Sequence, residues 1–234
     1  MARDMQAAPK GTRLGRGGGL ALVVAGLLVL SSVLFPRPDD PSNYAEFLAL
    51  LVDNAARTRV VLLAVPLGIW VLAAAVVAIQ RSLVDGLAAG WLRLGTCGVL
   101  VGTAAITVQF GLGAGALAEG VSGAADTGVI LLAAAAYVRA FGMMVFWLGL
   151  ALVGVGMLTS GAYPRWIGVP AVALGLSMVV VSSLSITTGV TLLTVAISGV
   201  IAALTALWAV VLGIASARRG RPAMHTAVAE PPAR

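Results

Sequence analysis

Residues 129–158 read VILLAAAAYVRAFGMMVFWLGLALVGVGML, a run of 30 residues in which Arg139 is the only charged side chain. As one α-helix this run would be about 45 Å long, whereas the hydrocarbon core of a bilayer is about 30 Å thick. A helix satisfies its own backbone hydrogen bonds, as a segment in lipid must. The run therefore predicts a transmembrane helix that tilts, projects from the bilayer or begins outside its core.

Five further apolar runs accompany this one. The chain has 234 residues, of which 60% are hydrophobic and 10% are charged, whereas soluble domains carry about 25% charged residues. We therefore expect an all-α fold, a polytopic transmembrane bundle of about six helices in one domain, residues 19–215. The basic tails 1–18 and 216–234 are expected to be disordered. The expected spans are 19–35, 60–79, 94–117, 129–158, 167–184 and 190–215.

The first run has two interpretations. A basic start followed by an apolar stretch also describes a secretory signal peptide. The run ends in the sequence SSVLFP (31–36), which is not a small-x-small cleavage site. We therefore favour a signal anchor that is retained.

Residues 36–59 form the longest polar stretch between the expected spans. The PRPDDP run (36–41) cannot be helical, because proline fixes φ and removes a backbone donor. After it, Asn43 and Glu46 have the spacing of a capping box, and apolar residues recur at helical intervals. The pattern predicts a short amphipathic helix at the outer membrane surface, after the first span. Its apolar face is expected to hold Tyr44, Phe47, Leu48, Leu51, Val52 and Ala55.

Basic residues are distributed unequally over the expected bundle. With the N-terminus inside, eleven of the fifteen Lys and Arg residues fall in cytoplasmic segments, and three fall outside with six of the nine acids. Cytoplasmic loops carry such an excess, and tryptophan marks the interfaces. Trp91 and Trp166 fall at the inner interface. We therefore expect a multi-pass protein of a bacterial plasma membrane with both termini cytoplasmic.

Arg139 is the candidate residue with the clearest chemistry. A charged side chain within a span is expected to face the bundle interior and to pair with a ligand or another charge. The alternative places Arg139 at the outer boundary of the core, with its guanidinium reaching the headgroups. Counting back about 20 residues, the length of a span, from Leu158 reaches Arg139, which suits that alternative. The candidate partners are Glu119 and Asp126, expected on the same side.

Further polar residues lie in the third and fourth expected spans. Gln109, with Thr103 and Thr107, and Tyr137 would line a polar site near Arg139. The alternative is that the threonines bond to their own helix, as they commonly do in membranes. The same two interpretations, a ligand path or helix packing, apply to the hydroxyl-rich residues 177–194.

Glycine and proline positions predict how the helices pack. The sequences GVLVG (98–102) and GLGAG (111–115) have the spacing that lets membrane helices approach closely. These faces are expected to pack within one subunit, against a second copy or against another membrane protein. Pro66 and Pro170 lie inside expected spans and predict helix kinks.

Several kinds of site lack the residues that they need. The only histidine, His225, lies in the C-terminal tail, so no span supplies imidazole for haem, copper, zinc or di-iron. No Walker A or H-E-x-x-H motif occurs, and the single cysteine, Cys97, allows no intrachain disulfide. We expect no metal or other cofactor. The basic residues form no continuous face, so we expect no nucleic acid partner.

Residues 160–168 read SGAYPRWIG and are followed by ALGL (173–176). Together with the glycines before them, these residues resemble an uncharacterised bacterial family of six-helix integral membrane proteins, a domain of unknown function. The resemblance is confined largely to the fourth and fifth spans. It implies the six-span layout and implies no activity.

Three classes of function follow from these patterns. The first is a non-enzymatic accessory, scaffold or envelope-sensing protein, because no catalytic constellation is recognisable. The second is a small transporter or permease-like protein with a polar site near Arg139. The third, an intramembrane enzyme acting on lipid, requires Gln109, Arg139 and Tyr137 to converge. The lipid bilayer is the expected partner in all three.

Overall fold

The computed structural model describes residues 16–81 and 86–219, and these residues form helices and no strands. The expected all-α fold is therefore confirmed. The tails expected at 1–18 and 216–234 lie largely outside the described residues, although α1 already begins at Arg16 and α7 ends at Arg219. The elements are α1 (Arg16–Leu30), η1 (Ser31–Leu34), α2 (Tyr44–Asp53), α3 (Ala55–Arg81), α4 (Gly86–Ser122), α5 (Ala125–Ser160), α6 (Arg165–Thr188) and α7 (Leu192–Arg219).

Five helices, α3 to α7, are long and apolar enough to cross a membrane. The first expected span is the exception, because α1 has only 15 residues. That length corresponds to about 22 Å, and the four residues of η1 add roughly 8 Å. The fold is that of a multi-pass membrane protein with five helices long enough to span a membrane and a shorter apolar helix, α1.

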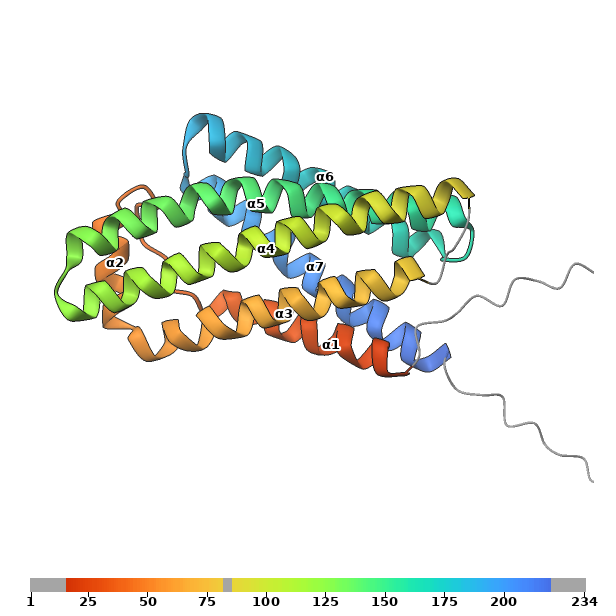
Figure 1. The fold of residues 1–234 in the computed structure, drawn as a ribbon, viewed down its shortest axis with the longest axis horizontal. Coiled ribbons are helices and arrows are strands. Elements are labelled where there is room, and N and C mark those ends of the chain that lie inside the picture. Colours follow the sequence, from red (N-terminus) through yellow and green to blue (C-terminus); the bar gives the residue numbers. More distant parts are fainter. Residues whose placement is uncertain (1–15, 82–85, 220–234) are drawn as a thin grey trace, which may run out of the picture.

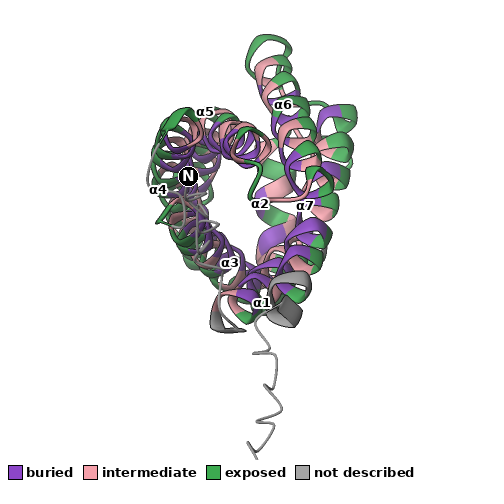
Figure 2. Ribbon diagram, turned by 90° about the vertical axis from the view of Figure 1, so that its right-hand side faces the viewer, coloured by how far each residue is buried: buried purple, intermediate pink, exposed green. Residues whose placement is uncertain are grey.

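The six helices α1 and α3 to α7 form a closed ring (Figure 2). Around it, α3 contacts α4, α4 contacts α5, α5 contacts α6, α6 contacts α7, α7 contacts α1, and α1 contacts α3. The beginning of α1 and the end of α7 lie at the same end of the bundle (Figure 1), where Gly19 lies against Gly213. Helix α2 lies at the opposite end, against α3, α4 and α5.

The longest feature is the hairpin of α4 and α5. The expected loop 118–128 is wrong: α4 continues to Ser122 and α5 starts at Ala125. No proline interrupts this segment, and the turn is made at Gly123, whose φ of +93° suits glycine. With 37 and 36 residues, the two helices are about 55 Å long and extend beyond α3 (Figure 1).

Small residues bring α4 and α5 into close contact. A Cβ at Gly102 would lie 2.5 Å from the Cα of Phe146, and one at Gly149 would lie 2.5 Å from the backbone nitrogen of Val99. The 98–102 spacing therefore packs inside one subunit. By contrast, Gly111 has nothing within 4 Å of its Cβ position, so the 111–115 spacing makes no comparable contact at its first glycine.

Helix α2 is amphipathic, as its sequence pattern predicts. The side chain of Asn43 accepts a hydrogen bond from the backbone of Glu46 at 3.2 Å, which is the expected N-cap. Leu48 and Leu51 are buried, while Glu46 and Asp53 are exposed. Leu48 lies against Gly120 and Gly128, near the tip of the hairpin. The apolar face thus packs on α4 and α5, and its place relative to a membrane stays a prediction.

The turn between α5 and α6 is tighter than the expected 159–166. Helix α5 ends at Ser160, Gly161 adopts a left-handed conformation with φ 63°, and α6 starts at Arg165. Pro66 and Pro170 lie inside continuous helices, α3 and α6. Close to Pro170, the indole of Trp208 donates a hydrogen bond of 3.0 Å to the carbonyl of Ile167, which ties α7 to α6.

Candidate functional site

The interior of the ring is divided into two hydrophobic clusters. The main cluster has members on α1 and on α3 to α7 and includes Phe146, Leu150 and Met157 of α5. The hairpin cluster lies under α2 and consists of Leu48, Leu51, Leu62, Ala116, Leu117 and Leu132. Phe35 and Phe110 pack against both. On α5 the two clusters are separated by the stretch between Leu132 and Phe146, which contains Arg139.

Arg139 points into the ring. Gly142 and Gly149 place one side of α5 against α4, whereas Gly154 places another side against Val172 of α6. At about 100° per residue, Arg139 points between these two contact faces, in line with the buried Leu150 and Met157. It occupies the middle of the inward stripe of α5.

Arg139 is the exposed member of this otherwise buried stripe. Its neighbours along the stripe, Leu132, Ala135, Gly142, Phe146, Leu150, Val153 and Met157, are all buried. The Arg139 side chain itself is exposed. Ala136 and Met143, one turn away on either side, are partly exposed as well. Because Arg139 is exposed and lies on the inward stripe of α5, its neighbours leave it accessible from inside the ring.

The depth of Arg139 along the bundle can be derived by comparison with α3. Residues 60–80 of α3 are uncharged and lie between Arg59 and Arg81; they span about 32 Å, the thickness of a hydrocarbon core. Trp70, the midpoint, donates a hydrogen bond of 3.0 Å to the hydroxyl of Thr107 on α4. On α4, Ala105 lies against Gly142. Arg139 is therefore within about one helical turn of the midpoint of α3.

The structure does not bring the predicted partners of Arg139 to it. Asp126 lies 13 residues away along α5, about 20 Å, and Glu119 lies near the same tip on α4. Among residues 16–81 and 86–219, no ion pair or hydrogen bond to Arg139 is formed. The guanidinium is left available for a ligand or for water.

Tyr137 lies apart from Arg139, whereas Gln109 lies on α4 at about the level of Arg139, because Ala105 faces Gly142 in the antiparallel hairpin. Tyr137 is two residues before Arg139, about 200° around the helix, and is 70% exposed on the outer face of the ring. Gln109 is half-buried on α4, and its side-chain oxygen has no partner. Tyr137 therefore points away from Arg139, and no hydrogen bond joins Gln109 to Arg139 among the described residues.

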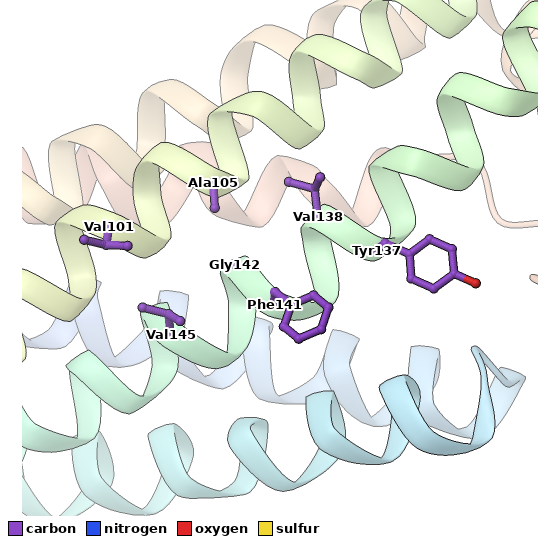
Figure 3. A pocket seen from close by; sticks show the side chains of 7 residues that line it. All are labelled: Val101, Ala105, Tyr137, Val138, Phe141, Gly142 and Val145. Carbon is purple, nitrogen blue, oxygen red and sulfur yellow. The ribbon is translucent and has the colours of Figure 1, made fainter.

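Tyr137 belongs instead to an apolar groove of about 350 Å³ on the outer surface of α4 and α5. Figure 3 shows its ring extending along α5, away from Val101 and Val145. The groove is lined by Val101, Ala105, Tyr137, Val138, Phe141, Gly142 and Val145.

The hydroxyl groups follow the packing interpretation. Thr103 donates to the carbonyl of Val99 and Thr107 to that of Thr103, one turn back in the same helix. Most of the described hydroxyls of α6 and α7 also donate to a backbone carbonyl three or four residues earlier. Those bonded to their own helix are Ser183, Ser185, Thr187, Thr188, Thr194, Ser198 and Thr205. Their donors are occupied, so they offer a ligand only acceptor lone pairs.

Arg37 is a second cation that the sequence patterns did not single out. It is exposed, in the segment between η1 and α2, and its Nη2 lies 3.6 Å from the Cβ position of Gly199 on α7. The preceding Phe35 contacts both clusters. No pattern in the sequence links residue 37 to residue 199, and only the fold brings them together.

Two ionisable groups outside the spans have shifted pKa values. The Ser42 hydroxyl and backbone N–H donate to Asp40 at 2.6 and 2.9 Å, and these bonds lower the pKa of its carboxyl group. Burial raises the pKa of Tyr44, and the nearby Tyr137 raises it further. Asp40 is therefore an anion at neutral pH and Tyr44 is uncharged, and neither forms an ion pair or hydrogen bond with Arg139.

Neither a metal-binding cluster among the described residues nor a known relative helps to assign a role to this site. The described part of the chain holds no group of three or more His, Cys, Asp or Glu residues that could hold a metal ion. No protein-family model matches the chain, and no curated protein or solved structure shows significant similarity to it. The resemblance to a six-helix bacterial family therefore stays a prediction.

Proposed function

We propose that this multi-pass membrane protein holds an anionic group at Arg139 inside its helical ring, as a small transporter or permease does. The observation that carries the proposal is the direction of Arg139: it lies on the inward stripe of α5, is exposed, has no partner among the described residues and is close to the middle of the bundle. An arginine at the centre of a membrane helix is unfavourable by about 2.5–3.5 kcal/mol or more. Facing an accessible interior, where water or an anion solvates it, reduces that cost.

The alternative position for Arg139, at the outer boundary with its guanidinium among headgroups, fits less well. A side chain that reaches the headgroups from a span starts on the lipid-facing side of its helix. On α5 that side carries Tyr137, Phe141 and Leu148, all exposed. Arg139 is on the opposite side.

The distribution of arginines over the two ends of the bundle supports the expected orientation. Arg81 ends α3, Arg165 begins α6 and Arg93 lies in the first turns of α4, all toward the end of the bundle where α1 begins. We take this end as cytoplasmic, because Lys and Arg accumulate there. The hairpin tip, with Glu119 and Asp126, then faces the outside.

The proposal is tested by cysteine labelling. In a Cys97→Ala background, which removes the exposed native thiol, Arg139→Cys is compared with Leu148→Cys, a lipid-facing control on the same helix. A charged thiol reagent added to membranes should modify the cysteine at 139 and spare the one at 148. If position 139 resists the reagent from both sides of the membrane, the proposal is wrong.

An accessory or scaffold protein is the second candidate. The apolar groove on α4 and α5 favours it, because such a surface suits contact with another helix as well as with lipid. This interpretation requires a stable partner, so purification in mild detergent that yields a lone monomer would count against it. A lipid-modifying enzyme is less well supported as a candidate, because Tyr137 points away from Arg139.

A further inference from the structure

The surroundings of Arg139 indicate which anions suit it. Along α5, Met143 and Phe146 lie on the C-terminal side of Arg139 at the main cluster, and Leu132 lies on its N-terminal side in the hairpin cluster. Phe110 and Phe35 pack against both clusters. A ligand that reaches Arg139 thus meets aromatic and aliphatic side chains on either side of a single cation.

The indole N–H of Trp147 and the hydroxyl of Thr96 are buried without a partner, but several other hydroxyls of α4 and α6 are already used as donors. The hydroxyls of Thr103 and Thr107 on α4 and of Ser183 and Ser185 on α6 donate to carbonyls of their own helices. A sugar, polyol or nucleotide would leave several of its polar groups unpaired there, and each such group is costly when buried. The guanidinium, by contrast, presents a planar fork of donors that matches a carboxylate or phosphate.

We propose that the ligand is an amphiphile, a single carboxylate or phosphate group carried on an apolar chain, with its anionic head on Arg139 and its chain against the main and hairpin clusters. This inference rests on the proposed function and narrows it to one substrate class. Two sources share this chemistry: a free amphiphile such as a fatty acid, and the headgroup of an anionic phospholipid.

The test is a binding assay with the full chain in nanodiscs of zwitterionic lipid. Radiolabelled dodecanoate is the probe, with dodecyl phosphate as the second amphiphile. Acetate and inorganic phosphate serve as polar anions, and dodecanol serves as the uncharged chain. Phosphatidylglycerol added to the discs then distinguishes the sources: loss of dodecanoate binding identifies a lipid headgroup, and unchanged binding identifies a free amphiphile.

We expect saturable binding of dodecanoate and dodecyl phosphate that weakens at least about tenfold in Arg139→Gln. Arg139→Lys keeps the positive charge and loses the planar guanidinium, so it should retain part of the binding. Arg165→Gln is the control, because Arg165 is an exposed arginine at the start of α6. Monodisperse elution and unchanged thermal unfolding show that each variant is folded.

The outcomes separate the two proposals. If acetate or phosphate binds in an Arg139-dependent manner and the amphiphiles do not, the amphiphile inference is wrong and the proposed function stands. If dodecanoate binds equally well to Arg139→Gln, or if dodecanol competes as well as dodecanoate, the inference is also wrong. If none of the anions binds, both proposals fail.

Discussion

The direction of Arg139 is set by residues that do not touch it. Gly142 and Gly149 hold one side of α5 against α4, and Gly154 holds another against α6. These contacts fix the rotation of α5 about its axis and leave Arg139 facing the ring. The sequence identifies Arg139 as a candidate because it is the only charge in its run. Its direction is not predictable from sequence, because no local pattern says which helices flank α5.

The grouping of Tyr137 with Arg139 fails for a simpler reason. Two residues apart on a helix are separated by about 200°, so they cannot share a face. That part of the candidate site was open to correction from the sequence alone. The position of Arg37 could not be predicted from the sequence. It lies beside Gly199 because of the path that the segment after η1 takes next to α7.

Gly102 and Gly111 have the same kind of spacing in the sequence and different roles in the fold. A Cβ at Gly102 would collide with the backbone of Phe146, whereas a Cβ at Gly111 meets nothing within 4 Å. We expect Gly102→Ala to destabilise the protein by about 1–3 kcal/mol through overpacking. Gly111→Ala should be neutral or stabilising by up to about 1 kcal/mol, because alanine favours the helix.

Unfolding of the two variants by denaturant in the same detergent measures this difference. Equal stability of Gly102→Ala and Gly111→Ala would mean that α4 and α5 do not pack as closely as the structure shows.

At the scale of elements, the sequence predicts which segments are helical better than where they end. The apolar runs place α3 to α7, and the capping residues place α2. The helix ends of the hairpin are missed, because charged residues such as Glu119 and Asp126 suggest a loop although nothing there breaks a helix. The docking of α2 on the hairpin is also missed, because an amphipathic pattern shows that a face is buried without showing what covers it.

Leu48 is the main contact between α2 and the hairpin. It is 3% exposed and lies against Gly120 and Gly128. Leu48→Ala leaves a cavity, and changes of this kind lower stability by about 2–5 kcal/mol. We therefore expect α2 to lose hydrogen-exchange protection while α3 keeps it.

The half-buried Leu50 in the same helix provides the control, and Leu50→Ala should have a smaller effect. If both variants leave the exchange of α2 unchanged, the helix is not held by the hairpin.

At the scale of the whole molecule, the ring is the feature that the sequence could not give. Hydrophobic runs predict the number of helices, yet the order in which they touch depends on contacts between residues far apart, such as Trp208 of α7 with Ile167 of α6. The ring also explains why Arg139 is tolerated near the middle of the bundle: the helix order places it on the inside.

The orientation of the ring leads to a prediction of its own. A fluorescent protein fused after the C-terminus should fluoresce, because we expect that end in the cytoplasm, where most Lys and Arg residues lie. Alkaline phosphatase inserted at Gly123, the tip of the hairpin, should be active outside the cytoplasm. An inactive phosphatase at Gly123 combined with an active one at the C-terminus would invert the topology.

The most direct test of the central claim is a spin-label scan of residues 136–148 in the Cys97→Ala background, with the protein in lipid bilayers. If the interior at Arg139 is accessible, collision with a polar nickel reagent should peak at positions 136, 139 and 143, on the inward side of α5. Collision with oxygen should peak instead at 137, 141 and 148, on the lipid side. Nickel accessibility that follows the lipid-facing positions, or that is absent throughout the scan, would contradict an accessible interior at Arg139.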